Sequence, residues 1–255
     1  MPTGLGDEEL WLSPTVANNV NPFDDQSGNG NNGTAQGGMG TVADTSNGGS
    51  FAYEFDGTND YVSVPQANFN FLRETNYFST SAWVKADSIT AQKTIIGGDL
   101  DNSDHGIFFA NDAVSGGIRG SRAVGTNPYS PDTKSSTNLT VSQWMHACWV
   151  VNGTTSTLYL NGVQIFQETG TFNTSTGSLD KPVYIGCYSS GSGLYSFWDG
   201  LQDDIRIFDR ALTQAEITHL ATSRGVLGPP GGTANYNPFR NAKYINKTYQ
   251  IPRFG

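Results

Sequence analysis

The chain has 255 residues, of which 31 are Gly and only 15% are charged. This composition excludes a coiled coil and a charge-driven disordered chain, and it is typical of short strands joined by many turns. The formal net charge of −9 excludes a nucleic-acid-binding protein, since phosphates require a basic surface. No apolar stretch is long enough for a membrane span, and the N-terminus has neither the basic nor the apolar region of a secretory signal.

Charge divides the chain into an acidic body and a basic tail. The tail, residues 225–255, holds four bases and no acid, so it carries +4. The first 224 residues hold the other ten bases and all 23 acids, a net of −13. Since 225–232 is rich in Pro and Gly, as linkers are, we predict an N-terminal segment over 1–9, one domain over 10–224, and linker plus tail over 225–255.

Alternating apolar residues predict strands along the body. In the first strand, 51–55, Phe51, Tyr53 and Phe55 share one face. Asn161-Gly162 lies between two apolar runs and predicts a hairpin with a type I′ turn, which needs two positive φ angles. Further strands are expected at 61–65, 80–85, 144–151, 158–160, 163–166, 183–186 and 201–208.

One helix is indicated at the end of the body. Thr213 and Glu216 have the spacing of a capping box, and Gly225 follows the last turn. Many strands, one short helix and no alternation of strands with helices predict an all-β sandwich of two sheets. The residues expected in its interior are Phe55, Trp83, Trp144, Trp149, Leu158, Leu160, Ile185, Ile205 and Ile207.

Seven short motifs occur in the order of a known family. They are DQSGNGN from Asp25, FDGTNDYV from Phe55, SAWVK from Ser81, QWMH from Gln143, LYLNG from Leu158, YIG from Tyr184 and GLQDDIRIF from Gly200. Together they resemble the laminin-G/pentraxin-like branch of the concanavalin A-like lectin/glucanase superfamily. This resemblance implies a jelly-roll sandwich of two antiparallel sheets.

The same resemblance implies a structural Ca²⁺ between the first loop and the last long strand. Asp25 and Asn29 would supply the loop ligands, and Asp203 or Asp204 the strand ligand. Asp204 is preferred because it holds the second Asp position of the motif. The alternative is that Asp25 and Asn29 only form turns, and that Asp204 pairs with Arg206.

Two loops carry aromatic residues among small polar ones. Tyr129 lies in one loop, while Tyr188, Tyr195 and Trp198 lie in the other. These four rings are candidates for stacking against a sugar. The alternative is that they pack the loops or contact another protein.

Catalysis on glycans is not expected. Glycoside hydrolysis needs two carboxyl groups about 5–9.5 Å apart, and glucanases of this superfamily place them in a Glu-x-Asp-x-x-Glu run. None of the six Glu lies in such a run, and the three His form no metal-binding pair. We therefore expect a non-enzymatic protein.

An acidic lectin-like body with a basic-aromatic tail resembles the virion accessory proteins of tailed bacteriophages. The resemblance implies a decoration protein of a capsid or tail surface, assembled in the host cytoplasm. Its partners would be other virion proteins, copies of itself and host-surface glycans, with neither nucleic acid nor membrane. The tail residues expected to dock are Tyr236, Phe239, Arg240, Lys243, Tyr244, Lys247, Tyr249, Arg253 and Phe254.

Two alternatives remain open at this point. The body is also compatible with a carbohydrate-binding module of a cell-surface or secreted protein, although the missing signal peptide and the dedicated short tail count against it. A separate alternative to docking on an assembly is that the tail folds back on its own sandwich.

Overall fold

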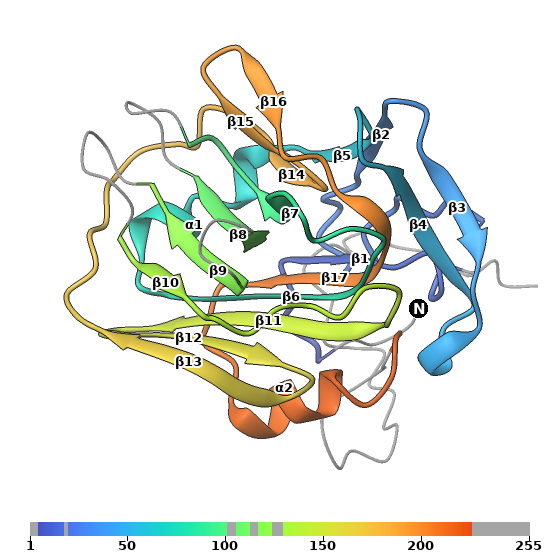
Figure 1. The fold of residues 1–255 in the computed structure, drawn as a ribbon. Coiled ribbons are helices and arrows are strands. Elements are labelled where there is room, and N and C mark those ends of the chain that lie inside the picture. The colour runs from blue at the N-terminus through green and yellow to red at the C-terminus, as the bar shows by residue number, and fades with distance from the viewer. Residues whose placement is uncertain (1–4, 18–19, 101–105, 113–116, 124–129, 226–255) are drawn as a thin grey trace, which may run out of the picture.

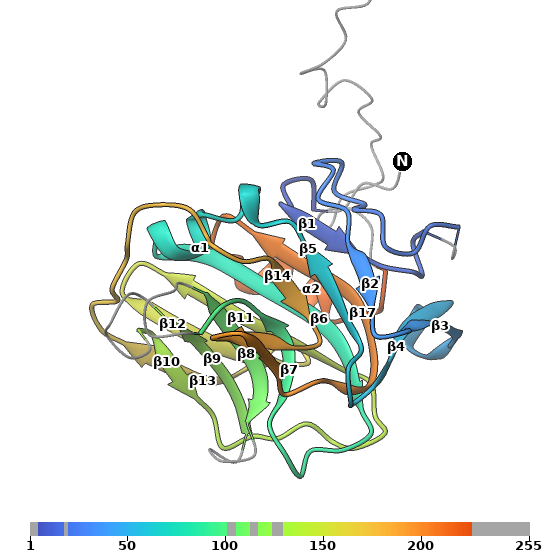
Figure 2. The same cartoon turned by 90° about the horizontal axis from the view of Figure 1, so that it is seen from above.

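The computed structural model describes residues 5–17, 20–100, 106–112, 117–123 and 130–225. Its strands form two antiparallel sheets that face one another, and a separate two-stranded hairpin (Figure 1). In the view from above, one sheet overlaps the other (Figure 2). The all-β sandwich that the sequence pattern predicts is therefore confirmed.

The larger sheet, called here the large sheet, has the order β13-β12-β11-β6-β17-β4-β3, with β1 also paired to β17. Its strands are β1 (Leu10–Leu12), β3 (Gly40–Ala43), β4 (Phe51–Asp56), β6 (Tyr77–Ala86), β11 (Met145–Asn152), β12 (Thr155–Leu160), β13 (Val163–Thr169) and β17 (Asp199–Phe208).

The other sheet, called here the small sheet, has the order β10-β9-β8-β7-β14-β5-β2. Its strands are β2 (Thr34–Gln36), β5 (Tyr61–Val64), β7 (Lys93–Gly97), β8 (Ile107–Asp112), β9 (Gly117–Arg122), β10 (Asp132–Lys134) and β14 (Val183–Ile185). The hairpin consists of β15 (Tyr188–Ser190) and β16 (Gly193–Tyr195).

Two helices accompany the strands, α1 (Phe71–Glu74) and α2 (Gln214–Leu220), with 3-10 turns at Ser46–Gly48 and Gln66–Asn68. The capping box of α2 is formed as predicted. The Thr213 side chain accepts from the Glu216 N–H, and the Glu216 carboxylate accepts from the Thr213 N–H at 2.8 Å. The helix lies on the outer side of the large sheet (Figure 1), where Ile217 and Leu220 bury against Phe208.

All nine residues predicted for the interior are buried, but they do not share one core. Seven of them lie in the main cluster between the sheets. Trp83 and Trp144 instead form a small cluster with Ala52. In β6, Trp83 alternates with Ala82 and Val84, which belong to the main cluster, so it faces the outer side of the large sheet.

The Asn161-Gly162 hairpin is confirmed. It joins β12 to β13, and both residues have positive φ, 50° at Asn161 and 79° at Gly162. A type I′ turn requires positive φ at both central residues, and hairpins favour this turn because its twist matches that of the two strands.

The described part of the N-terminal segment packs on the domain. Leu5 lies against the apolar cluster under α2. Asp7 forms an ion pair with Arg210, and Glu8 forms a buried ion pair with Arg206 at 2.7 Å. Residues 5–9 are thus physically part of the body, ahead of the boundary expected at residue 10.

Candidate functional site

The implied cation site centres on an irregularity in β17. One edge of this strand pairs with β4 along residues 199–202 and with β1 along 205–207. Between these segments the register against β6 shifts, and Asp204 has a left-handed φ of 52°. Such a bulge bends the strand and redirects side chains. Asp203 and Asp204 are both buried there.

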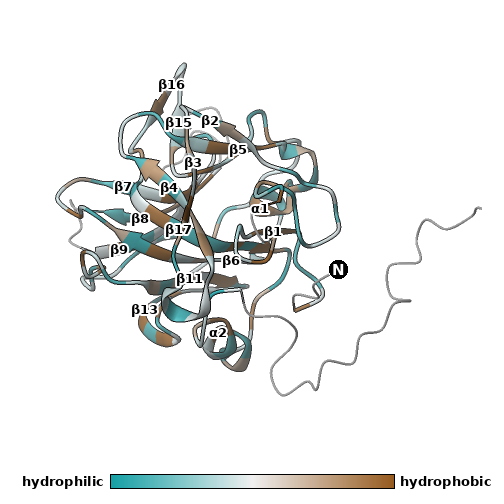
Figure 3. Ribbon diagram, turned by 90° about the vertical axis from the view of Figure 1, so that its right-hand side faces the viewer, coloured by the Kyte–Doolittle hydropathy of each residue, from teal (hydrophilic) through white to brown (hydrophobic). Residues whose placement is uncertain are grey.

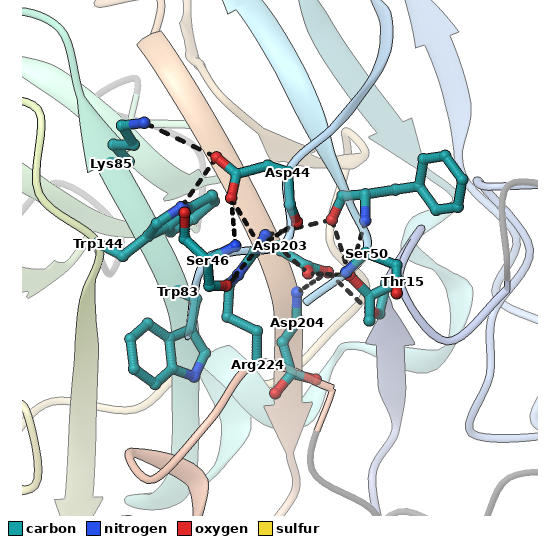
Figure 4. A network of polar contacts seen from close by, with 12 residues as sticks. Thr15, Asp44, Ser46, Ser50, Trp83, Lys85, Trp144, Asp203, Asp204 and Arg224 are labelled. Atoms are coloured by element: carbon teal, nitrogen blue, oxygen red, sulfur yellow. Dashed lines mark hydrogen bonds and ion pairs between the residues drawn. The ribbon is translucent and has the colours of Figure 1, made fainter. Parts of the chain in front are cut away.

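The Asp203 carboxylate is surrounded by donors from distant segments (Figure 4). Its Oδ1 accepts from Ser13 Oγ and from the Asp204 N–H, each at 2.7 Å. Its Oδ2 accepts from Thr15 Oγ1 at 2.6 Å and from Arg224 Nη1 at 3.3 Å. Burial, and then the neighbouring Asp204 charge, nevertheless raise the pKa of Asp203 to about 7.

Asp204 pairs with Arg206, the alternative that the sequence left open. Arg206 approaches Asp204 Oδ1 with Nε at 2.9 Å and Nη2 at 2.8 Å. Trp11 Nε1 donates to the same oxygen at 2.6 Å. The guanidinium of Arg206 also stacks 4.1 Å from the centre of the Trp11 ring.

Asp25 organises the first loop through four hydrogen bonds. Its Oδ1 accepts from the N–H groups of Trp11 and Ser27, each at 3.0 Å. Its Oδ2 accepts from Ser27 Oγ at 2.7 Å and from the Asn31 N–H at 3.0 Å. The side-chain amide of Asn29 donates a hydrogen bond to the Glu8 carbonyl at 2.8 Å.

These residues do not fit a hard cation. A carboxylate offers about four acceptor sites, and both Asp25 and Asp203 already accept four hydrogen bonds. Asp204 faces a guanidinium. In the described part of the chain, no three His, Cys, Asp or Glu side chains converge as metal ligands. Internal Arg side chains provide the positive charge that the resemblance assigns to Ca²⁺.

Arg224 completes this network on the outer side of the large sheet. Its Nη2 lies 3.1 Å from Asp44 Oδ1 and 2.8 Å from the Ser46 carbonyl. Its guanidinium lies 4.0 Å from the centre of the Trp144 ring, and Trp144 Nε1 donates to Asp44 Oδ2 at 3.2 Å. Figure 4 shows Arg224 between the loop that holds Asp44 and the bulge of β17.

A surface that fits a ligand better lies on the outer face of the small sheet. Val62 in β5, Ile107 in β8 and Ile185 in β14 point into the core, so the residue next to each of them in its strand points outward. Strand register aligns one outward row across all seven strands, which consists of Thr34, Ser63, Tyr184, Gly97, Phe108, Ser121 and Asp132.

The hairpin β15–β16 packs on this row at Gly97. A Cβ atom at Gly97 would lie 2.3 Å from the Cys187 carbonyl oxygen, so only glycine permits this approach. The Ser189 N–H donates to the Gly98 carbonyl at 3.0 Å, and Lys181 Nζ donates to the Gly191 carbonyl in the hairpin turn at 2.7 Å. The hairpin is thereby fixed at its base and at its tip, and it projects from the sandwich (Figure 3).

Two of the predicted ligand residues come together on this hairpin. Tyr188 and Tyr195 face each other across the strands with ring centres 5.7 Å apart. Tyr188 is half-buried and makes an edge contact with Phe108 at 5.3 Å, whereas Tyr195 is 48% exposed. The pair thus has a supported inner ring and an accessible outer ring.

Of the other two predicted ligand residues, one is buried and one lies outside the described residues. Trp198 is fully buried in the main core, so the prediction that it stacks on a sugar is corrected: its ring has no face open to solvent. Tyr129 and the nine tail residues lie outside the described residues.

Sequence reasoning missed a second set of rings beside the hairpin. Tyr61 lies 5.8 Å from Tyr184 and 6.3 Å from Phe197, measured between ring centres. Alternation placed Tyr61 on one face of its strand, but it did not show that this face is the outer face of the sheet. We call these rings together the aromatic face; it consists of Tyr61, Phe108, Tyr184, Tyr188, Tyr195 and Phe197, of which Phe108 and Tyr184 are buried.

Arg119 borders the aromatic face. Its guanidinium lies 5.5 Å from the centre of the Phe108 ring. It forms ion pairs with Asp112 at 3.1 Å and with Asp132 at 2.7 Å, and Asp132 also pairs with Lys134 at 2.8 Å. Planar rings flanked by hydroxyl and guanidinium donors suit a ligand with an apolar face and polar edges.

Comparison with protein families gives one match. The model described as the concanavalin A-like lectin/glucanases superfamily matches residues 56–218. Among curated proteins, none matches this chain.

Solved structures with the same fold include a domain of a glycan-degrading enzyme. The fourth domain of AbnA, a GH43 extracellular arabinanase from Geobacillus stearothermophilus solved in complex with arabinotriose, has a TM-score of 0.67 and 23% identity. The match covers 87% of this chain and 100% of that one.

Two toxin binding domains are also similar. The binding domain of Paraclostridial Mosquitocidal Protein 1 has a TM-score of 0.60, 18% identity, and coverage of 84% of this chain and 52% of that one. The binding domain of botulinum neurotoxin DC in complex with SialylT has a TM-score of 0.60, 16% identity, and coverage of 84% and 51%. This chain thus spans about half the length of either toxin chain, and at such identities the likeness shows the fold alone.

Proposed function

Because this chain belongs to the concanavalin A-like lectin/glucanases superfamily, we propose that it is a carbohydrate-binding domain without catalytic activity, and that the aromatic face binds the sugar. The observation that carries the proposal is the Tyr188–Tyr195 pair, in which an exposed ring is backed by a half-buried one. A sugar ring presents an apolar C–H face that stacks on such an exposed ring.

The polar groups and the fixed position of the hairpin support ligand binding by the aromatic face rather than simple packing. The hydroxyl of Tyr184 is a donor at neutral pH, as that of any tyrosine is, and burial raises its pKa further, to about 12. The hairpin is held by backbone hydrogen bonds and by Lys181, so a ligand does not have to order it. The similar arabinanase domain was solved with a neutral trisaccharide, which favours the same ligand class here.

The carboxylates near the face support a non-catalytic role. Asp112 and Asp132 are held by one guanidinium, that of Arg119. A nucleophile needs direct access to the sugar, and Asp112 is buried, which opposes that access.

The proposal is tested by titration with a glycan identified on an array, or with arabinotriose. Tyr195→Ala should weaken binding roughly tenfold, as expected for an aromatic anchor. Tyr195→Phe should bind almost as well as the wild type, since it keeps the ring. The matched control is Phe166→Ala, which removes another exposed ring, on β13. Equal loss in the Phe166 variant would contradict the aromatic face.

An assembly role remains the second proposal, and it is carried by the tail alone. The +4 charge of residues 225–255 complements the −13 of the body, or an acidic patch on a shell protein. We propose on this basis a decoration protein of a virion surface, assembled in the cytoplasm of the host. None of the structures named above is described as a virion protein, so the carbohydrate-binding proposal has the stronger support.

Deletion of residues 233–255 tests the assembly role. The described residues up to Gly225 contain the hydrophobic core of the two-sheet sandwich, so the truncated protein should fold. It should then fail to join particles. Normal incorporation of the truncated protein would contradict the docking role of the tail.

A further inference from the structure

A surface hollow of about 480 Å³ lies at one end of the sandwich, away from the hairpin. It is formed where β6 begins, where β11 turns into β12, and where the chain leaves β13. Its walls include Glu74, Asn76, Tyr77, Thr154, Thr171 and Thr174. Ligand sites span roughly 300–1,000 Å³, so this volume suits a small ligand.

The floor of the hollow is fixed from inside by Arg122. This side chain is fully buried, and it donates to the Thr75 carbonyl at 2.5 Å, to Asn76 Oδ1 at 2.5 Å, and to the Asn173 carbonyl. Asn76 Nδ2 in turn donates to the Phe172 carbonyl at 3.0 Å. The loop after β13 is therefore tied to the start of β6, and the hollow exists before a ligand enters.

Tyr77 provides the aromatic wall. Its side chain is 54% exposed, although large aromatic residues are usually buried. Opposite it lies Gly153, with a left-handed φ of 64°. A Cβ atom at Gly153 would lie 3.3 Å from the Tyr77 hydroxyl. The glycine thus serves the turn and leaves the Tyr77 ring uncovered.

Most of the exposed lining of the hollow is apolar, and the polar groups among it select the ligand by charge. Thr154, Thr171 and Thr174 are exposed and bring three hydroxyl groups, and Glu74 brings an exposed carboxylate. Neither Lys nor Arg is among the residues that line the hollow. An anion such as a phosphate would meet the Glu74 charge without a compensating cation, and a purely apolar ligand would leave the hydroxyls without partners.

We infer that this hollow is a second carbohydrate site, which takes a short neutral oligosaccharide. The sugar stacks on Tyr77, and the Glu74 carboxylate accepts hydrogen bonds from adjacent sugar hydroxyls. This inference concerns residues that share no element with the hairpin β15–β16. It extends the proposed function to a domain with two binding surfaces but does not depend on the aromatic face.

The test uses the full chain with tyrosine rings labelled with ¹³C, titrated with arabinotriose, cellotriose and mannotriose. The Tyr77 resonance is assigned from the spectrum of Tyr77→Phe. We expect at least one trisaccharide to shift Tyr77 in the wild type. Tyr77→Ala and Glu74→Gln should each weaken binding at the hollow roughly tenfold, whereas the control Phe166→Ala should not.

The hairpin variant Tyr188→Ala/Tyr195→Ala separates the two sites. If Tyr77 still shifts in this variant, the hollow binds sugar by itself. The inference is wrong if the hairpin variant loses all binding, or if none of the three probes shifts Tyr77 in the wild type. In either case the aromatic face is tested separately, by the effect of the Tyr188 and Tyr195 substitutions on binding. If only Tyr77→Ala and Glu74→Gln lose binding, the hollow is the sugar site and the aromatic face is not.

Discussion

Arg224 is a clear case of one side chain holding distant segments together. It is fully buried, lies 3.3 Å from Asp203 and 3.1 Å from Asp44, and stacks on Trp144. No sequence motif indicated this role, because Arg224 stands beside the tail, far along the chain from Asp44. The carboxylates of β17 were found from a motif, but their partners are set by tertiary packing.

Replacing Arg224 by Met should strongly destabilise the fold. Removing one member of a buried ion pair leaves an uncompensated charge and costs about 3–5 kcal/mol. The free energy of unfolding, measured by urea titration, should fall by this amount. The control is Arg210→Met, which breaks a partly exposed ion pair with Asp7 and should cost about 1 kcal/mol or less. Equal losses in both variants would contradict a special role for Arg224.

His146 should make the protein less stable in acid. Burial, and then the charge of Arg206, lower the pKa of His146 to about 3. As pH falls below the ordinary value of about 6.5, the unfolded chain takes up a proton on this residue but the folded protein does not, so stability falls. Asp203, with its pKa raised to about 7, acts in the opposite sense: its contribution to the free energy of unfolding is lost as pH rises from about 4 to 7.

The histidine contribution is isolated by comparing His146→Gln with the wild type. Between pH 6.5 and 5 the variant should lose less unfolding free energy than the wild type, because only the wild type has the histidine proton to bind on unfolding. The slope of unfolding free energy against pH is the measured quantity, since the substitution itself changes the absolute value. Parallel slopes would show that His146 does not titrate between the two states.

At the scale of elements, alternation and turn chemistry identified the central strands of the large sheet. Both β4 and β17 were found, and the Asn161-Gly162 turn fixed the β12–β13 hairpin. In the small sheet β5 and β14 were found, whereas β2, β7, β8, β9 and β10 were missed. In β9, Gly117 and Gly120 interrupt any apolar alternation, and Gly120 is required because the Trp149 ring packs where a Cβ would stand, 2.5 Å from its Cδ2. A close approach of this kind depends on the opposite sheet and has no local pattern.

The capping box of α2 permits a test at the same scale. Thr213→Ala removes the hydroxyl that accepts from the Glu216 N–H and should cost about 1 kcal/mol of unfolding free energy. Thr218→Ala, an exposed change within the helix, is the control and should cost much less. If the two variants have the same stability, the cap does not hold the helix.

At the scale of the whole molecule, the sequence motifs identified the fold and two of the six rings of the aromatic face. Tyr188 and Tyr195 were found because they lie in one loop with small polar residues. Tyr61 and Phe108 join them only through the register of seven strands, which no short motif contains. The hollow at Tyr77 likewise combines three chain segments. In the described part of the chain, no helix has the length and apolar character to cross a membrane.

Chelation should leave the melting temperature unchanged. The carboxylates expected to bind Ca²⁺ are satisfied by Arg206, Arg224 and neutral donors. Ca²⁺ should therefore not bind the folded protein, and an ion that does not bind cannot stabilise it. Thermal melting in EDTA and in excess Ca²⁺ checks this. A lower melting temperature in EDTA that Ca²⁺ restores would show that a cation holds the first loop to β17.

Binding of sugar by the aromatic face is the central claim, and a paired glycan array tests it most directly. Wild type and Tyr188→Ala/Tyr195→Ala are applied at equal concentration, after circular dichroism has shown that both are folded. We expect the wild type to bind a defined group of neutral glycans, and the variant to lose that group or retain only the weaker signals of the hollow. A variant with the same profile as the wild type, or a wild type that binds no glycan, would contradict the account.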